Sequence, residues 1–299
     1  MRMAKPGAKV SAGPVERARA RGCPLRRNAT PRKMDIGRLV LYGVALFATG
    51  VIFFLTFFYQ YVRAIRSPLK DRHNPKHADY VAPTEPLAAS ATAFHKAMLP
   101  NGDIDVYAFQ RAYAAFVAEV LDRIDDLGVR VHAQGMHNHE EKLQSALVAF
   151  ELRKGMPAGR SLRSLFFWEK GLKIHSPGGI IADESAAAAV LWLRFGLQTW
   201  LNFFTLCGAS NKDGVEAGPL AEQAIEASHG DVLGFWSRTL VSFVARRMGR
   251  WDAFAQSIGG SVAETEKDAK RWCAQVQEVI LTLKALQREF DYEDKRASV

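Results

Sequence analysis

Apolar residues recur at helical spacing along most of the C-terminal two thirds of the chain, and no run alternates with the period of two expected of a half-buried strand. The clearest amphipathic stretch, 104–127, gathers its large apolar side chains on one face, and Gly128 is expected to end it. The segment 174–182 contains a proline and two glycines and is expected to be a loop. Further helices are predicted at residues 139–154, 161–173, 219–228, 232–248, 251–258 and 263–290. The pattern therefore predicts an all-α domain over residues 87–299.

One stretch of this domain, from Val190 to Leu206, is apolar almost all round. Its polar exceptions, Arg194, Gln198 and Asn202, lie four residues apart and form one narrow stripe. A helix of this kind is typical of the centre of a bundle. The alternative is a membrane span, but Arg194 near its middle would cost a few kcal/mol in a bilayer.

Residues 39–62 form a second apolar stretch, with 24 residues and no charged side chain. At 1.5 Å per residue such a helix would be about 36 Å long, more than the roughly 30 Å hydrocarbon core of a bilayer. Tyr42 lies near one end, and Tyr59 and Tyr61 lie near the other, as is usual at membrane interfaces. The alternatives are a buried core helix or a signal peptide, whose apolar region is shorter and precedes a cleavage site of small residues. We therefore expect one transmembrane helix at 39–62.

Positive charge brackets the predicted span. The net charge of the chain is +9, yet residues 1–38 carry eleven Lys and Arg against two acidic residues, and residues 63–77 carry a further net +4. The remaining residues are net negative, which argues against a nucleic-acid-binding domain. We expect 1–38 to be a basic, disordered tail, and 63–86, with four prolines, to be a spacer.

The charge bias around the span gives a prediction of topology. Seven Lys and Arg precede the span closely and five follow it, which favours a cytoplasmic N-terminus; a start at Met34 would reverse the bias. The helical domain has no Asn-x-Ser/Thr sequon, which permits a cytosolic location. We expect a single-pass protein of an endomembrane or the plasma membrane, with the helical domain in the cytosol.

The sequence contains no enzyme signature: GxSxG, HExxH, the P-loop and a strand-associated GxGxxG are all absent. Cys207 and Cys273 lie in apolar helical sequence and are expected to be reduced, buried thiols. His132, His137 and His139 are followed by two glutamates and could suggest a metal, but solvent-facing histidines at a helix start are the simpler interpretation. We expect no enzymatic activity, no metal and no cofactor.

Three segments carry a resemblance to a known family. Residues 188–204 (AAVLWLRFGLQTWLNFF) are similar to the pattern LxWLxRGLxFIxxFL, 221–230 (AEQAIEASHG) to AYxxALxxxHG, and 289–292 (EFDY) to ELNY. In order and helical context they resemble the glycolipid transfer protein family. The resemblance implies a two-layer, all-helical sandwich that holds lipid chains between its layers and the headgroup outside.

The resemblance also implies a headgroup site. Trp192 would be the platform on which the first sugar stacks, with plain core packing as the alternative. His229, where one helix gives way to the next, would donate a hydrogen bond to the ceramide amide carbonyl. The other lipid-binding residues implied by the resemblance are Lys142, His139, Asn138 and Tyr292.

This chain departs from the family pattern D-x-x-x-N-x-x-K on the second helix. Gly135 occupies the position of the aspartate, His139 that of the asparagine and Lys142 that of the lysine. A register shifted by one residue gives no aspartate either. The branch that binds ceramide-1-phosphate carries arginine where this chain has Trp192, and another basic residue where Phe195 stands. The resemblance thus favours a sphingolipid or glycosphingolipid over a phosphate headgroup.

Two functions follow from these features. The first is a membrane-anchored protein that binds a sphingolipid or glycolipid and transfers it between closely apposed membranes. The second is a helical adaptor or scaffold for protein partners, in which the headgroup site has degenerated. The missing carboxylate at Gly135 favours the second more than any other residue does.

Overall fold

A computed structural model of the chain describes residues 84–154, 160–176, 180–210, 214–229, 235–258 and 260–293. The predicted basic tail, the predicted span at 39–62 and nearly all of the predicted spacer lie outside these residues. None of the helices within the described residues combines the length and apolar character that a membrane crossing requires.

The described chain is built from helices, and its extended pairings are isolated bridges between single residues. The helices are, in chain order, α3 (Pro86–Ala97), α4 (Val106–Phe116), η1 (Val117–Leu121), α5 (Leu127–Lys154), α6 (Leu162–Gly171), α7 (Ala186–Ala209), α8 (Ala217–His229), α9 (Phe235–Ala245), α10 (Trp251–Ser257) and α11 (Val262–Phe290). The element η1 is one short π-helix that continues α4. The all-α prediction is confirmed for the residues that the structure describes.

The start of α5 differs from the prediction. The first amphipathic helix ends at Leu121, and α5 begins at Leu127, twelve residues earlier than expected. Gly128 therefore lies in the first turn of α5 and does not end the preceding helix. The side chain of Asp126 explains this start, because its Oδ1 accepts hydrogen bonds from the backbone N–H groups of Gly128 (2.8 Å) and Val129 (3.2 Å).

A second constraint acts on Gly128. A Cβ atom at this position would lie 2.8 Å from Cγ of Met248 and 3.0 Å from the carbonyl oxygen of Val244, so a larger residue would push α9 away. Next to this contact, Oδ2 of Asp126 accepts a hydrogen bond from the backbone N–H of Gly249 (3.0 Å). The C-terminal end of α9 is thereby fixed against the first turn of α5.

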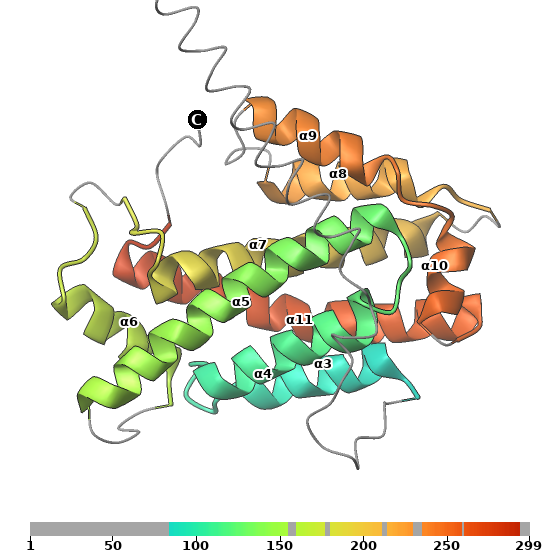
Figure 1. The fold of residues 1–299 in the computed structure, drawn as a ribbon. Coiled ribbons are helices and arrows are strands. Elements are labelled where there is room, and N and C mark those ends of the chain that lie inside the picture. The colour runs from blue at the N-terminus through green and yellow to red at the C-terminus, as the bar shows by residue number, and fades with distance from the viewer. Residues whose placement is uncertain are drawn as a thin grey trace, which may run out of the picture. The chain divides into compact units, whose positions relative to one another are not determined.

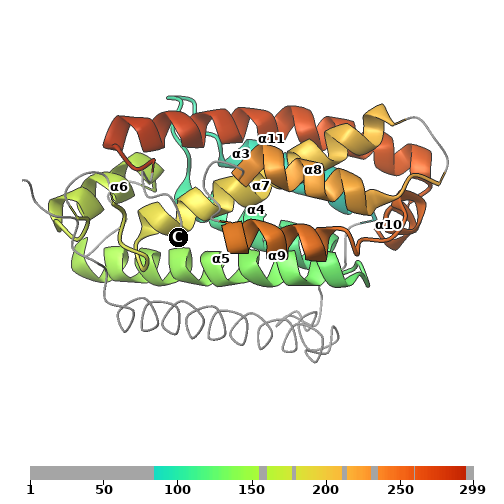
Figure 2. The same cartoon turned by 90° about the horizontal axis from the view of Figure 1, so that it is seen from above.

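The helix α7 is the central helix of the bundle. It lies between α5 and α11, and it also packs on α8 (Figures 1 and 2). Most of its residues are buried, including Arg194, whose guanidinium carbon lies 4.6 Å from the ring centroid of Phe195. The predicted polar stripe continues onto α8: Gln198 donates to Asn202 (3.0 Å), and Asn202 donates to Oγ of Ser228 (3.0 Å). The prediction of a central bundle helix is confirmed.

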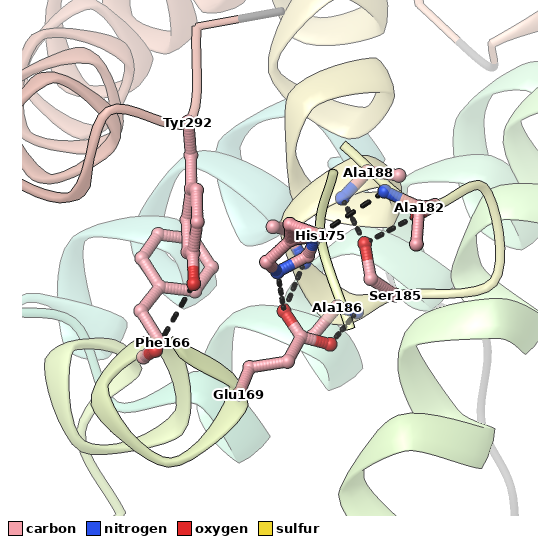
Figure 3. Close-up of polar contacts among 9 residues, drawn as sticks. Phe166, Glu169, His175, Ala182, Ser185, Ala186, Ala188 and Tyr292 are labelled. Carbon is pink, nitrogen blue, oxygen red and sulfur yellow. Dashed lines mark hydrogen bonds and ion pairs between the residues drawn. The ribbon is translucent and has the colours of Figure 1, made fainter. Parts of the chain in front are cut away.

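The buried N-terminus of α7 meets a carboxylate from α6 (Figure 3). Glu169 is 2% exposed and accepts hydrogen bonds from the backbone N–H groups of Ala186 and Ala187, the latter at 2.9 Å. Nε2 of His175 lies 3.7 Å from the same carboxylate. Negative charge is favoured here because the first N–H groups of a helix lack partners within it and the helix dipole is positive at this end. The carboxylate therefore makes burial of this helix end possible.

On the side of α7 that faces α3, α4 and α11, aromatic rings form the core. Trp272 of α11 is fully buried, stacks on Phe116 (5.0 Å between centroids) and donates from Nε1 to Oγ of Ser90 (3.2 Å). Phe94 and Phe204 pack edge-on against the same indole. The large apolar residues expected to face inward from 104–127 are buried, as predicted.

Candidate functional site

An apolar cavity of about 190 Å³ lies among α5, α7, α8 and α9. It is larger than the engineered apolar cavity of about 150 Å³ that admits benzene, so a short apolar segment of a ligand fits without rearrangement. Its lining is mainly hydrocarbon and aromatic, and apart from the indoles of Trp192 and Trp200 it includes four polar side chains. These polar residues are His132 and His139 of α5, Thr199 of α7 and His229 of α8.

The indole of Trp192 lies at this cavity with two imidazole rings nearly parallel to it. The ring of His139, from α5, is 5.6 Å from the indole centroid and inclined by 11°. The ring of His229, from α8, is 6.2 Å away and inclined by 22°. Phe195, one turn further along α7, contacts both Trp192 (5.8 Å) and His229 (5.1 Å). The structure thus brings together three residues that the sequence analysis singled out from distant segments: His139, Trp192 and His229.

His229 is the buried last residue of α8. Its Nδ1 lies 3.3 Å from Oγ1 of Thr199, and the same hydroxyl donates to the carbonyl oxygen of Phe195 (3.0 Å). Because the Thr199 proton is used on that carbonyl, the hydroxyl can accept from an Nδ1–H group, leaving Nε2 as the acceptor. The pKa of His229 is lowered to about 4, mainly by burial and in smaller part by the nearby charge of Arg194, while a hydrogen bond with the backbone of Ile225 acts in the opposite direction.

The two histidines of α5 that line the cavity are also neutral at pH 7. Burial, together with the charges of His229 and His139, lowers the pKa of His132 to about 3. Burial and the charge of Lys142 lower the pKa of His139 to about 4. Nε2 of His132 and Nδ1 of His139 are buried, and neither has a hydrogen-bond partner among the described residues. The cavity therefore offers hydrogen-bonding groups without offering charge.

The expectation that these histidines face solvent is wrong for His132 and His139, because α5 begins at Leu127 and turns both toward the cavity. His137 does not line the cavity; its Nε2 lies 3.1 Å from the carboxylate of Asp122. Within the described part of the chain, no group of three His, Cys, Asp or Glu side chains is placed to hold a metal ion.

Gly135 lies between His132 and His139 on the cavity wall. A Cβ atom at this position would have no neighbour within 4 Å. The aspartate that the family pattern has here is therefore absent without any steric reason, and the position has room for a side chain.

Lys142 and Asn138 do not line the cavity. Nζ of Lys142, one turn beyond His139, donates to the carbonyl oxygen of Asp183 (3.3 Å) and pairs with the carboxylate of Glu184 (3.2 Å). Asn138 accepts a hydrogen bond from Gln134 within the same helix (3.1 Å). Lys142 thus connects α5 to the loop before α7, at the outer side of the site.

Tyr292 lies elsewhere. It is buried, its hydroxyl donates to the carbonyl oxygen of Phe166 (3.3 Å), and its ring contacts His175 at 4.7 Å (Figure 3). These contacts join the end of α11 to α6 and to the loop that follows α6. In this structure Tyr292 has a packing role and does not line the cavity.

Two polar residues of the cavity, His132 and Thr199, were not among the predicted site residues. A signal for His132 exists in the sequence, because it precedes His139 by seven residues and therefore shares its helix face. The two residues share a helix face only if the helix extends back to residue 132, whereas the predicted helix begins at residue 139. Thr199 follows Trp192 by the same interval on α7.

No family model and no curated protein sequence matches the chain, whereas solved structures do match. Human ceramide-1-phosphate transfer protein in complex with 12:0 ceramide-1-phosphate matches with a TM-score of 0.60 at 14% identity, over 70% of this chain and 99% of that one. The mouse apo-form matches at 0.59 and 15%, over 70% and 98%. FAPP2, described as selecting simple glycosphingolipids with the GLTP fold, matches at 0.56 and 16%, over 71% and 99%. The helical domain therefore has the glycolipid transfer protein fold, in agreement with the sequence analysis.

The lowered imidazole pKa values predict a loss of stability in acid. An unfolded histidine titrates near pH 6.5, whereas these three titrate near pH 3 to 4 in the folded protein. Between these values the unfolded chain binds more protons, so the free energy of unfolding falls as the pH drops from about 6.5 toward 4. Thermal melts of the whole chain across this range should show the decline, and His132→Leu and His229→Gln should each make it shallower. A decline as steep in both variants as in the wild type would contradict burial of these rings.

Proposed function

We propose that this protein binds a sphingolipid, with the lipid chains in the cavity among α5, α7, α8 and α9, and transfers it between membranes. The observation that carries the proposal is the position of the cavity. It begins at Trp192, His139 and His229, where the family resemblance expects a headgroup, and continues along α5 to Gly128. Burial of apolar chain in such a site stabilises the complex by roughly 25 cal/mol per Å² removed from water.

The cavity in its present form is too small for two long lipid chains, so binding requires the walls to separate. The helix α9 is the wall best suited to move, because it packs on α8 and α5 and has no extensive contact with the central α7. Its C-terminal end is fixed at Gly128 and Asp126. A swing about that end would widen the cavity toward the N-terminal end of α9.

The charges around the site support an uncharged headgroup. The titratable side chains of the cavity wall are three neutral imidazoles, so a phosphate would gain no ion pair from them. Lys142 is already paired with Glu184, and Arg194 lies over the Phe195 ring; neither lines the cavity. A glycosylceramide or a similarly neutral sphingolipid is therefore the favoured ligand class.

The proposal predicts a gain of function. Gly135→Asp should strengthen binding of a simple glycosylceramide about tenfold, because a carboxylate would accept hydrogen bonds from the amide and a sugar hydroxyl. His229→Ala should weaken binding by about five- to tenfold through loss of one directed hydrogen bond. Both effects are measured by displacement of a fluorescent lipid from the whole chain, with melting curves recorded in parallel.

Matched controls make this test specific. Gly171→Asp at the end of α6 also adds a carboxylate where a Cβ has no neighbour within 4 Å, and His95→Ala removes an exposed imidazole from α3. Neither residue lines the cavity, so neither variant should alter affinity. If no lipid displaces the probe, and Gly135→Asp restores no binding, the helical adaptor becomes the favoured function.

That second function has an observation in its favour. The rings of His139 and His229 each stack on the indole of Trp192. This stacking covers indole surface that a sugar would need. An adaptor would keep this packing for stability and would bind no lipid.

We further propose that residues 39–62 anchor the domain in a membrane, as a single pass with the domain in the cytosol. The support is the uncharged run of 24 residues and the basic residues on both sides of it. Anchoring would hold the lipid-binding domain at high local concentration near its own membrane.

Removal of residues 1–62 tests the anchor. The whole chain should remain with membranes after carbonate washing, whereas the truncated chain should be released. Protease added to intact microsomes should digest the helical domain. Retention of the truncated chain would contradict the anchor, and full protection from protease would contradict the topology.

A further inference from the structure

The inner part of the cavity contains a polar group that a plain lipid chain would leave without a partner. His132 precedes His139 by seven residues on α5, which places it on the same face about 10 Å further along the helix axis. Both residues line the cavity. A lipid whose headgroup lay beside Trp192 and His139 would therefore pass His132 with the middle of its chain.

Within the part of the chain that the structure describes, Nε2 of His132 makes no hydrogen bond. The imidazole ring packs edge-to-face with Trp200 (5.5 Å between centroids, 82°), and its Nε2 is buried. The other cavity-lining residues include Met136, Phe203 and Trp200 itself, whose indole Nε1 likewise has no partner among the described residues. The one hydroxyl on the wall, that of Thr199, is occupied by the Phe195 carbonyl and by His229. Buried polar atoms in native proteins nearly always have a partner, so the partner of His132 is expected to come from the contents of the cavity.

The imidazole can present a nitrogen to the cavity without moving its neighbours. Rotation of the ring by half a turn about the Cβ–Cγ bond exchanges its nitrogen and carbon positions within nearly the same outline. Burial lowers the pKa of His132 to about 3, so the ring is neutral, with one N–H donor and one acceptor nitrogen. A hydroxyl group, which both donates and accepts, is the smallest partner that matches either nitrogen.

We infer that the preferred ligand carries a hydroxyl group part-way along one of its hydrocarbon chains, and that His132 binds this group. The inference rests on the proposed function and makes it more specific: the ligand class becomes a neutral sphingolipid with a mid-chain hydroxylated acyl or sphingoid chain. His139 and Trp192 would contact the headgroup end of the lipid, and His132 would favour a hydroxylated hydrocarbon chain over an unmodified one.

Two synthetic ceramides test this, identical except that one carries a hydroxyl near the middle of its N-acyl chain. Their affinities for the whole chain are measured by displacement of a fluorescent sphingolipid. The wild type should prefer the hydroxylated lipid by about fivefold, the effect of one net hydrogen bond in a buried site. A third ceramide with the hydroxyl beside the amide should show no such preference, because its hydroxyl would lie near His139.

Variants assign the preference to His132. His132→Leu should bind both lipids with equal affinity, and it should melt no lower than the wild type, since it removes an unpartnered polar group. His132→Gln keeps a donor and an acceptor and should retain a preference. His95→Leu, on the exposed face of α3, should behave as wild type.

The outcomes separate the two levels of the proposal. Equal affinity of the wild type for both lipids, as expected if an ordered water satisfies His132, would overturn this inference and leave lipid binding intact. A preference that survives in His132→Leu would also overturn it. If the wild type binds none of the lipids, the proposed function fails and this inference fails with it.

Discussion

Enclosure of α7 by α5, α8 and α11 is the constraint on which the rest of the structure depends. A helix buried to this extent needs partners for its first N–H groups, and Glu169 supplies them from α6. Its polar stripe must also be satisfied, and Asn202 and Ser228 meet this need toward α8. Trp192 and Thr199 lie on the side of α7 that lines the cavity.

The chemistry of the cavity follows from this burial. Imidazoles placed in apolar surroundings stay neutral at pH 7, because desolvation penalises their charged form. Such a wall discriminates by shape and by individual hydrogen bonds, and it provides no attraction for an anionic headgroup. The nearby cations, Lys142 and Arg194, have their own partners in Glu184 and the Phe195 ring. The proposal of a neutral rather than a phosphorylated sphingolipid rests on this chemistry.

The sequence predicted most of the fold because its apolar periodicity is strong in α4 and α11, and because α7 is apolar almost all round. The resemblance to the glycolipid transfer protein family also predicted that His139, Trp192 and His229 belong to one site. The sequence pattern failed at the start of α5, because Gly128 has the appearance of a helix stop, whereas its role is to permit contact with Met248. Because the helix was predicted to begin only at residue 139, His132 was not recognised as a site residue.

Sequence patterns also could not separate binding residues from packing residues. Tyr292 and Trp192 both match motifs of the family, yet Trp192 lines the cavity whereas Tyr292 joins the end of α11 to Phe166. Orientation of a side chain after a helix end depends on tertiary contacts, which no local spacing encodes.

The central claim, that the cavity is a lipid site, is tested most directly by native mass spectrometry of the whole chain purified from membranes. We expect one neutral sphingolipid per chain, lost in Gly135→Trp, which fills the cavity from a position open at Cβ. A wild-type chain without lipid, or equal lipid in Gly135→Trp, would contradict the account.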